Sequence, residues 1–226
     1  MRKLPLNNVI TEFTDNNMVK IKYNTDNGTT IKTITFNEYC KVILASRQAN
    51  KKKEDKYEET PVLPGFGYVR TIKYRKYSDG IECIFLSREA ASANITYFET
   101  EYKNVGIPKL VFMVKMFKKT IQELYVCAVK DEIIADDTQI YYYPFSNVFS
   151  DCRVCFGANN IASLDMASLV NLHSVPSLFL AIPNNDDEYG NNLSGLEYRP
   201  LLKKLQDKPF NDNWLKPMNR ALKKWL

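Results

Sequence analysis

Near the amino end of the chain, apolar and polar residues alternate in two short runs that flank a turn. The runs cover residues 18–23 and 29–36, and Asn27-Gly28 between them provides the residue types that a tight turn requires. Alternation with a period of two is typical of a half-buried strand. This part of the sequence therefore predicts a β-hairpin.

A helical pattern follows across residues 37–49, with Asn37 as the expected N-cap. One side of this helix is expected to carry its apolar residues, Tyr39, Val42, Ile43 and Ala49. Residues 50–65 then combine alternating charge blocks with two prolines and a glycine, which is typical of a surface loop. We expect residues 1–60 to form an N-terminal unit of hairpin, helix and charged loop. Residues 61–226 would form the main unit, either separate from the first or continuous with it.

The middle of the chain is a series of strand-like runs. Residues 67–89 predict a second hairpin with Asp79-Gly80 at its turn. Further runs rich in β-branched and aromatic residues follow, at residues 93–102, 108–117, 123–130 and 138–149. Because short turns join these runs, they indicate an antiparallel meander.

Towards the carboxyl end the pattern returns to helices. Residues 159–172 predict a buried helix, capped by Asn160 and limited by Pro176. The remaining segments are a polar loop and two short helices, at residues 183–195, 199–206 and 216–226. The last helix is expected to dock through Met218, Ala221, Leu222 and Trp225. The order of hairpin, helix, meander and helices predicts an α+β fold.

Bulk composition places few further limits. Hydrophobic residues make up 45% and charged residues 25%, as in an ordinary globular protein. The net charge of +5 is only mildly basic, so we interpret the basic residues 51–53 as a solvated loop, with nucleic-acid binding as a minor alternative. The chain has no signal-like amino end and no apolar run of about 18 residues. Its odd count of five cysteines indicates free thiols, so we expect a cytoplasmic protein without membrane spans.

Two of these cysteines, Cys152 and Cys155, stand three apart between a strand-like run and a helical one. A structural zinc ion needs two further ligands, but the remaining candidates are isolated along the chain: Cys40, Cys83, Cys127 and His173. A thioredoxin-like redox pair would begin at a helix N-terminus, whereas the expected helix starts several residues after Cys155. We therefore expect no metal and no cofactor here.

A Cys–His nucleophile is also disfavoured, because His173 follows the expected helix and lies well over one helical turn from Cys155. A thiol without a histidine base suits thioester exchange, since thiols are nucleophilic enough to accept an activated acyl group. Such a site needs a donor for the oxyanion that forms when an amine attacks, and an asparagine amide can serve. Asn147 precedes Cys155 by eight residues. A plain tight turn, in which Asn147 bonds its own backbone and both cysteines are buried filler, remains open.

The run "NVFSDCRVC" resembles the active-site segment of ubiquitin-conjugating enzymes, in which the catalytic cysteine follows the asparagine of a His-Pro-Asn motif at the same spacing. Pro144 stands three residues before Asn147 rather than one, and the histidine is missing. A longer match covers about residues 63–179. Its segments "IPKLVFMVK", "ELYVCAVK" and "DTQIYYYPFSNVFSDCRVCFG" are similar to a prokaryotic ubiquitin-conjugating-like family, protein B of the PRTRC cassette.

This resemblance implies a ubiquitin-conjugating-like sandwich, in which helices flank an antiparallel meander. It implies that Cys155 forms a thioester, that Asn147 shapes the site or supports the oxyanion, and that Cys152 is a bystander. The implied activity is cysteine-dependent transfer of a small ubiquitin-like modifier. The implied partners are that modifier, a ThiF-like activating enzyme and a JAB-type peptidase, encoded on mobile elements. The alternative is a catalytically inactive adaptor of the same fold that binds the modifier or the activating enzyme.

Overall fold

The computed structural model describes residues 9–14, 17–25, 28–45, 57–63, 67–157 and 169–225. Most of the helix expected at residues 159–172, including its cap Asn160, lies outside this range, as do Asn27 and the basic residues 51–53. Within the described part of the chain, no helix is both long and apolar enough to cross a membrane. The structure is a mixed α/β protein with antiparallel sheets and few helices, which agrees with the predicted α+β class in these general features.

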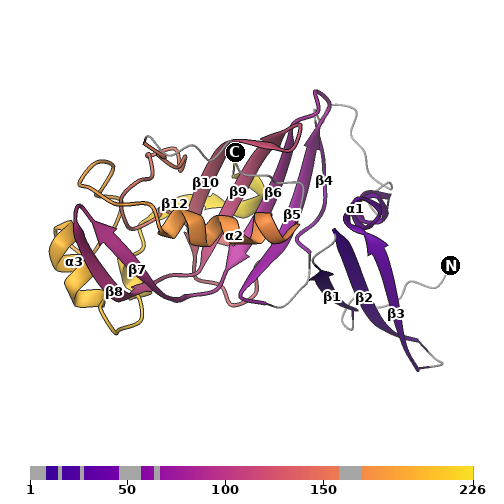
Figure 1. The fold of residues 1–226 in the computed structure, drawn as a ribbon, viewed down its shortest axis with the longest axis horizontal. Coiled ribbons are helices and arrows are strands. Elements are labelled where there is room, and N and C mark those ends of the chain that lie inside the picture. The colour runs from indigo at the N-terminus through magenta and orange to yellow at the C-terminus, as the bar shows by residue number, and fades with distance from the viewer. Residues whose placement is uncertain are drawn as a thin grey trace.

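The largest element is a seven-stranded antiparallel sheet (Figure 1). Its strands, in chain order, are β4 (Tyr57–Glu59), β5 (Val69–Tyr77), β6 (Glu82–Arg88), β9 (Leu110–Phe117), β10 (Thr120–Val129), β11 (Gln139–Tyr141) and β12 (Pro217–Ala221). Their order across the sheet is β12-β11-β10-β9-β6-β5-β4. The hairpin expected at residues 67–89 is confirmed as β5 and β6. At its turn Gly80 has a φ of 89°, and the Ile81 N–H donates to Asp79 Oδ1 at 3.1 Å.

The strand expected at residues 93–102 is wrong, because the chain turns back within it. Two strands, β7 (Ala91–Tyr97) and β8 (Thr100–Ile107), form a separate hairpin. Its turn is made at Phe98, which has a φ of 50° although it is not glycine. β6 then pairs directly with β9, so the expected meander is interrupted by a hairpin that leaves the sheet.

The N-terminal hairpin is confirmed as β2 (Met18–Thr25) and β3 (Gly28–Thr35), and β1 (Val9–Thr14) adds a third strand. The helix α1 (Phe36–Ala45) follows. Its start is capped by Thr35 rather than Asn37. The Glu38 N–H donates to Thr35 Oγ1 at 3.1 Å, and the Thr35 N–H donates to the Glu38 carboxylate at 2.9 Å. This reciprocal pair is a capping box, which satisfies two N–H groups at once and so outcompetes a single Asn cap.

The expected buried side of this helix is partly wrong, since Val42 is 59% exposed whereas Tyr39 is buried. The N-terminal strands also contact the main sheet's helix: the ring of Phe13 lies 5.8 Å from that of His173. The division of the chain at residue 60 stays a prediction.

The helix α2 (Leu169–Leu180) lies across one face of the main sheet (Figure 1). Pro176, expected to limit a helix, lies inside it, so that expectation is wrong. A proline removes one backbone hydrogen bond from a helix. Packing offsets this loss here, because Val175 and Phe179 on the same helix are buried and the Phe179 ring lies 5.6 Å from that of Phe112.

The opposite face of the sheet is covered by the end of the chain. The helix expected at residues 216–226 is wrong: this segment forms β12, which pairs with β11, and then a short 3-10 helix, Leu222–Lys224. Its docking is confirmed for Leu222 and Trp225, which are 1% and 0% exposed. The other C-terminal helix is confirmed as α3 (Tyr198–Leu205), which buries Tyr198, Leu201, Leu202 and Leu205.

Trp225 is the largest fully buried side chain, and its ring lies 6.2 Å from that of Phe85. We expect Trp225→Ala to lower the free energy of unfolding by about 3–5 kcal/mol, because it removes apolar contacts and leaves a cavity. Chemical denaturation followed by circular dichroism measures the loss. Lys224→Ala, at the exposed residue just before Trp225, is the control and should change stability by less than about 0.5 kcal/mol.

Candidate active site at the cysteine turn

The cysteine turn, which we define as residues 147–155, is closed by its own backbone. The Cys155 N–H donates to the carbonyl oxygen of Asn147 at 2.7 Å. Within the turn, Val148 and Val154 form an antiparallel bridge. The spacing that singles out Asn147 and Cys155 in the sequence therefore brings their backbones into direct contact.

The strand β10 supports this turn. The Val126 N–H donates to the Cys152 carbonyl at 2.9 Å, and the Val154 N–H donates to the Leu124 carbonyl at 2.8 Å. On β10, only the last residues, Ala128 and Val129, pair with β11. The cysteine turn occupies the rest of that edge of β10. Because main-chain bonds to a strand inside the sheet fix the turn, Cys155 stands on a rigid support.

Asn147 connects the turn to a distant loop. Its φ of 66° lies in the left-handed region, which asparagine tolerates better than most residues. Its Nδ2 donates to the Pro183 carbonyl at 3.0 Å, in the polar loop after α2. The side chain thus bonds outside its own turn, unlike in the tight-turn alternative. An amide nitrogen carries two hydrogens, so one N–H is held by Pro183 and a second is left on the same group.

The next residue in that loop, Asn184, is buried and bonds to both sides of the site. Its Oδ1 accepts from the Ser146 hydroxyl at 2.9 Å and from the Tyr198 hydroxyl at 2.6 Å. Its Nδ2 donates to the Ile182 carbonyl at 2.8 Å. Its backbone is bonded to β7 and to the β7–β8 turn, at Thr96 and Phe98. The residues before the cysteine turn, the polar loop and α3 are therefore joined through one amide.

The two cysteines of the turn have opposite environments. Cys155 is half-buried, whereas the other four cysteines are buried. Cys152 is 0% exposed, and its Sγ lies 3.5 Å from the Met218 sulfur. Burial raises the pKa of the Cys152 thiol to about 11, which keeps it protonated at neutral pH. Of the two, only Cys155 is placed to react with another molecule.

His173 contacts β5 and the N-terminal strand β1 rather than Cys155. Its Nε2 lies 3.2 Å from Thr71 Oγ1, its ring packs on Phe13, and burial lowers its pKa. Among the residues that the structure describes, no group of three or more Cys, His, Asp or Glu side chains lies together as a metal site would require.

Sequence reasoning missed the residues that support the turn. Pro183, Asn184 and Ser146 carry no motif, and the sequence shows only that the first two begin a polar loop. Asp186 of that loop accepts a hydrogen bond from the Tyr97 hydroxyl, at 2.6 Å to Oδ1. Asn and Asp residues gathered in a loop are a general signal for side-chain-to-backbone bonding, but they do not specify the partner.

An antiparallel sheet with a helix across one face, and a turn that presents a half-buried cysteine beside an asparagine, fits the ubiquitin-conjugating class. The chain belongs to prokaryotic E2 family D, whose model matches residues 39–218. This range contains both Asn147 and Cys155, and it confirms the resemblance to a prokaryotic ubiquitin-conjugating-like family. No curated protein and no solved structure matches the chain.

The difference in burial predicts which thiol reacts. Under native conditions at pH 8, iodoacetamide should modify Cys155 at least about a hundredfold faster than Cys152, because a thiol with a pKa of about 11 is roughly one part in a thousand thiolate. Peptide mapping by mass spectrometry gives the rate at each site. Unfolding in guanidinium chloride should make all five cysteines reactive. Fast labelling of Cys152 in the folded protein would contradict the described environment.

Asn184→Ala should destabilise the protein by about 2–4 kcal/mol, since it leaves the buried Ser146 and Tyr198 hydroxyls without their shared acceptor. Chemical denaturation measures this change. The matched control is Asn185→Ala, because among the described residues the Asn185 side chain bonds only to Asp187, in its own loop. That variant should lose less than about 1 kcal/mol.

Proposed function

We propose that the protein carries a small ubiquitin-like modifier as a thioester on Cys155 and passes it to an amine or to another thiol. The observation that carries this proposal is the closed turn, in which the Cys155 N–H is bonded to Asn147 O at 2.7 Å within the matched family range. The half-burial of Cys155 supports it, because the thiol is reachable but not fully solvated.

The proposed chemistry has two acyl transfers. First, the Cys155 thiolate attacks the modifier's carboxyl-terminal thioester on the activating enzyme, and a new S–C bond forms as the donor's thiolate leaves. Then an acceptor amine attacks the Cys155 thioester, the C–N bond forms, the Cys155 thiolate leaves and the amine's proton passes to solvent. Both steps proceed through an oxyanion, and neither needs the thiol to attack an unactivated amide.

Asn147 is the residue that we assign to the oxyanion. The bond from its Nδ2 to the Pro183 carbonyl orients the amide while leaving a second N–H on the same nitrogen. A single donor of this kind is typically worth about 10²–10³ in rate. Asparagine also suits the φ of 66° at this position, which strains most other side chains.

For the particular system, we propose a PRTRC-type cassette on a mobile element, with this chain as protein B acting in the cytoplasm. The support is the ordered resemblance of the strand segments and of "PFSNVFSDCRVCFG". The proposed partners are a ubiquitin-like modifier and a ThiF-like activating enzyme, with a JAB-type peptidase in the same system. E2 families in general act with a modifier and an activating enzyme, which is the broader basis for these partners.

The test combines the protein with the activating enzyme and the ubiquitin-like protein of the proposed cassette, together with ATP, and reads intact masses. We expect an adduct of one modifier that a thiol reductant removes. The Cys155→Ser variant should form no adduct that the reductant removes. Cys152→Ala is the matched control, three residues away in the same turn, and should still form the adduct.

Asn147→Ala should still accept the modifier but should discharge it to a free amine about 10²-fold more slowly. If no adduct forms while the modifier or the activating enzyme still binds, the protein is an adaptor of the same fold and the transfer proposal is wrong.

A further inference from the structure

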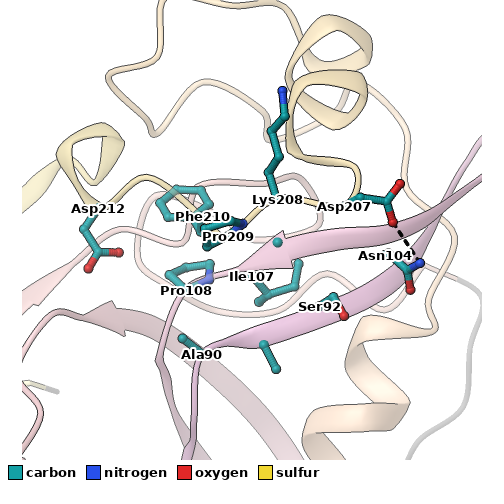
Figure 2. Close-up of a pocket in the computed structure, with 12 residues that line it drawn as sticks. Ala90, Ser92, Asn104, Ile107, Pro108, Asp207, Lys208, Pro209, Phe210 and Asp212 are labelled. Atoms are coloured by element: carbon teal, nitrogen blue, oxygen red, sulfur yellow. Dashed lines mark hydrogen bonds between the residues drawn. The ribbon is translucent and has the colours of Figure 1, made fainter.

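A groove of about 500 Å³ lies between the β7–β8 hairpin and the segment that follows α3 (Figure 2). Ser92 and Gly106, which are paired in the β7–β8 register, line it on the hairpin side. Pro108, Pro209 and Phe210 supply apolar surface. Its volume falls in the usual range of about 300–1,000 Å³ for ligand sites. None of its lining residues belongs to the cysteine turn.

The shape of this groove depends on a close backbone approach. A Cβ atom at Gly106 would lie 2.2 Å from the Lys208 carbonyl oxygen and 2.6 Å from the Phe210 nitrogen, so only glycine admits the passing chain. The Asp207 N–H donates to the Asn104 carbonyl at 2.9 Å. The wall is therefore attached to the hairpin by its main chain.

Two carboxylates, Asp207 and Asp212, stand on opposite sides of the groove (Figure 2). The Asp207 carboxylate accepts from Asn104 Nδ2 at 3.0 Å, which is a neutral partner. Burial raises the pKa of the Asp212 carboxyl, and the nearby Lys130 opposes this effect. Neither carboxylate forms an ion pair with any residue that the structure describes. The side chain of Lys208 points away from the two strands (Figure 2).

We propose that this groove binds an extended peptide segment of a partner protein that carries Lys or Arg on each side of a short apolar stretch. The apolar walls would pack on the middle of the segment and on the aliphatic stems of the basic residues, while their charged ends meet Asp207 and Asp212. The same carboxylates would repel a phosphate backbone, which argues against a nucleic acid in this groove.

One wall of the groove also lies next to the candidate active site. The ring of Phe210 lies 5.9 Å from that of Phe145, and Phe145 directly precedes Ser146 and the cysteine turn. A peptide that packs on Phe210 would therefore sit next to the support of the turn. Binding itself does not require the thioester chemistry, so this proposal goes beyond the proposed function and stands apart from it.

Fluorescence anisotropy with the full chain and labelled synthetic peptides tests the proposal. The panel has two lysines separated by about two to five apolar residues, which an extended chain spans at about 3.3 Å per residue. Its controls replace both lysines with glutamate or with glutamine. We expect a dibasic peptide to bind at least about tenfold more tightly than either control, and the preference to weaken as salt is raised.

Substitutions of the lining residues test whether the peptide binds in the groove. The double variant Asp207→Asn/Asp212→Asn should weaken dibasic binding by about tenfold or more. Ser92→Phe, a bulky change at an exposed lining position, should abolish it. The matched control Asp137→Asn removes an exposed carboxylate outside the groove and should leave binding unchanged. Thermal unfolding checks that each variant folds.

Cys155→Ser separates the two proposals, since it should keep peptide binding whatever the outcome of the thioester test. The groove proposal is overturned if no peptide binds, if the glutamate peptides bind as well as the dibasic ones, or if the Asp207→Asn/Asp212→Asn variant binds like the wild type.

Discussion

One buried amide, that of Asn184, bonds to segments that are far apart in the sequence. It accepts from hydroxyls just before the cysteine turn and at the start of α3, and its backbone pairs with the end of β7. A buried polar group without partners is costly, so the loss of one of these bonds would weaken the others. Because Pro183, the preceding residue, accepts from the amide of Asn147, the geometry beside Cys155 depends on this one arrangement.

The sheet edge explains why two cysteines three residues apart differ so much. The cysteine turn runs along β10, but Cys152 has a φ of 72°, which interrupts the two-residue alternation of side chains that a regular strand would show. Cys152 packs in the apolar cluster that contains Trp225, while Val154 packs in the cluster that contains Phe179. Cys155 follows where the pairing with β10 ends and is half-buried. Cys152 and Val154 thus anchor the turn on both faces of the sheet, and the free thiol comes directly after the anchors.

Local signals in the sequence were enough for some elements and not for others. The Asp79-Gly80 turn was predictable because its residue types require that geometry. The turn at Phe98 was not, because no Gly, Asn or Pro stands at the turn itself. From the sequence, Lys73 and Arg75 would belong to the solvent-exposed side of β5, yet both are 1% exposed. Their burial is possible because Glu59 and Asp136, from distant segments, form ion pairs with them. The Asn147–Cys155 spacing could be found in the sequence, whereas its dependence on Asn184 requires tertiary contacts.

The hairpin that leaves the main sheet has a consequence for how the chain folds. β6 and β9 pair at Arg88 and Leu110, and the β7–β8 hairpin between them pairs Ala91 with Ile107. Once this hairpin has formed, only a few residues on each side remain to be closed, so the loop entropy of joining β6 to β9 is small. Local pairing thus prepares the long-range pairing, which favours rapid assembly of the sheet centre. The outer end of the hairpin has a second task, because the Phe98 N–H at its turn donates to the Asn184 carbonyl, so a change in the length of this end would disturb the support of the cysteine turn.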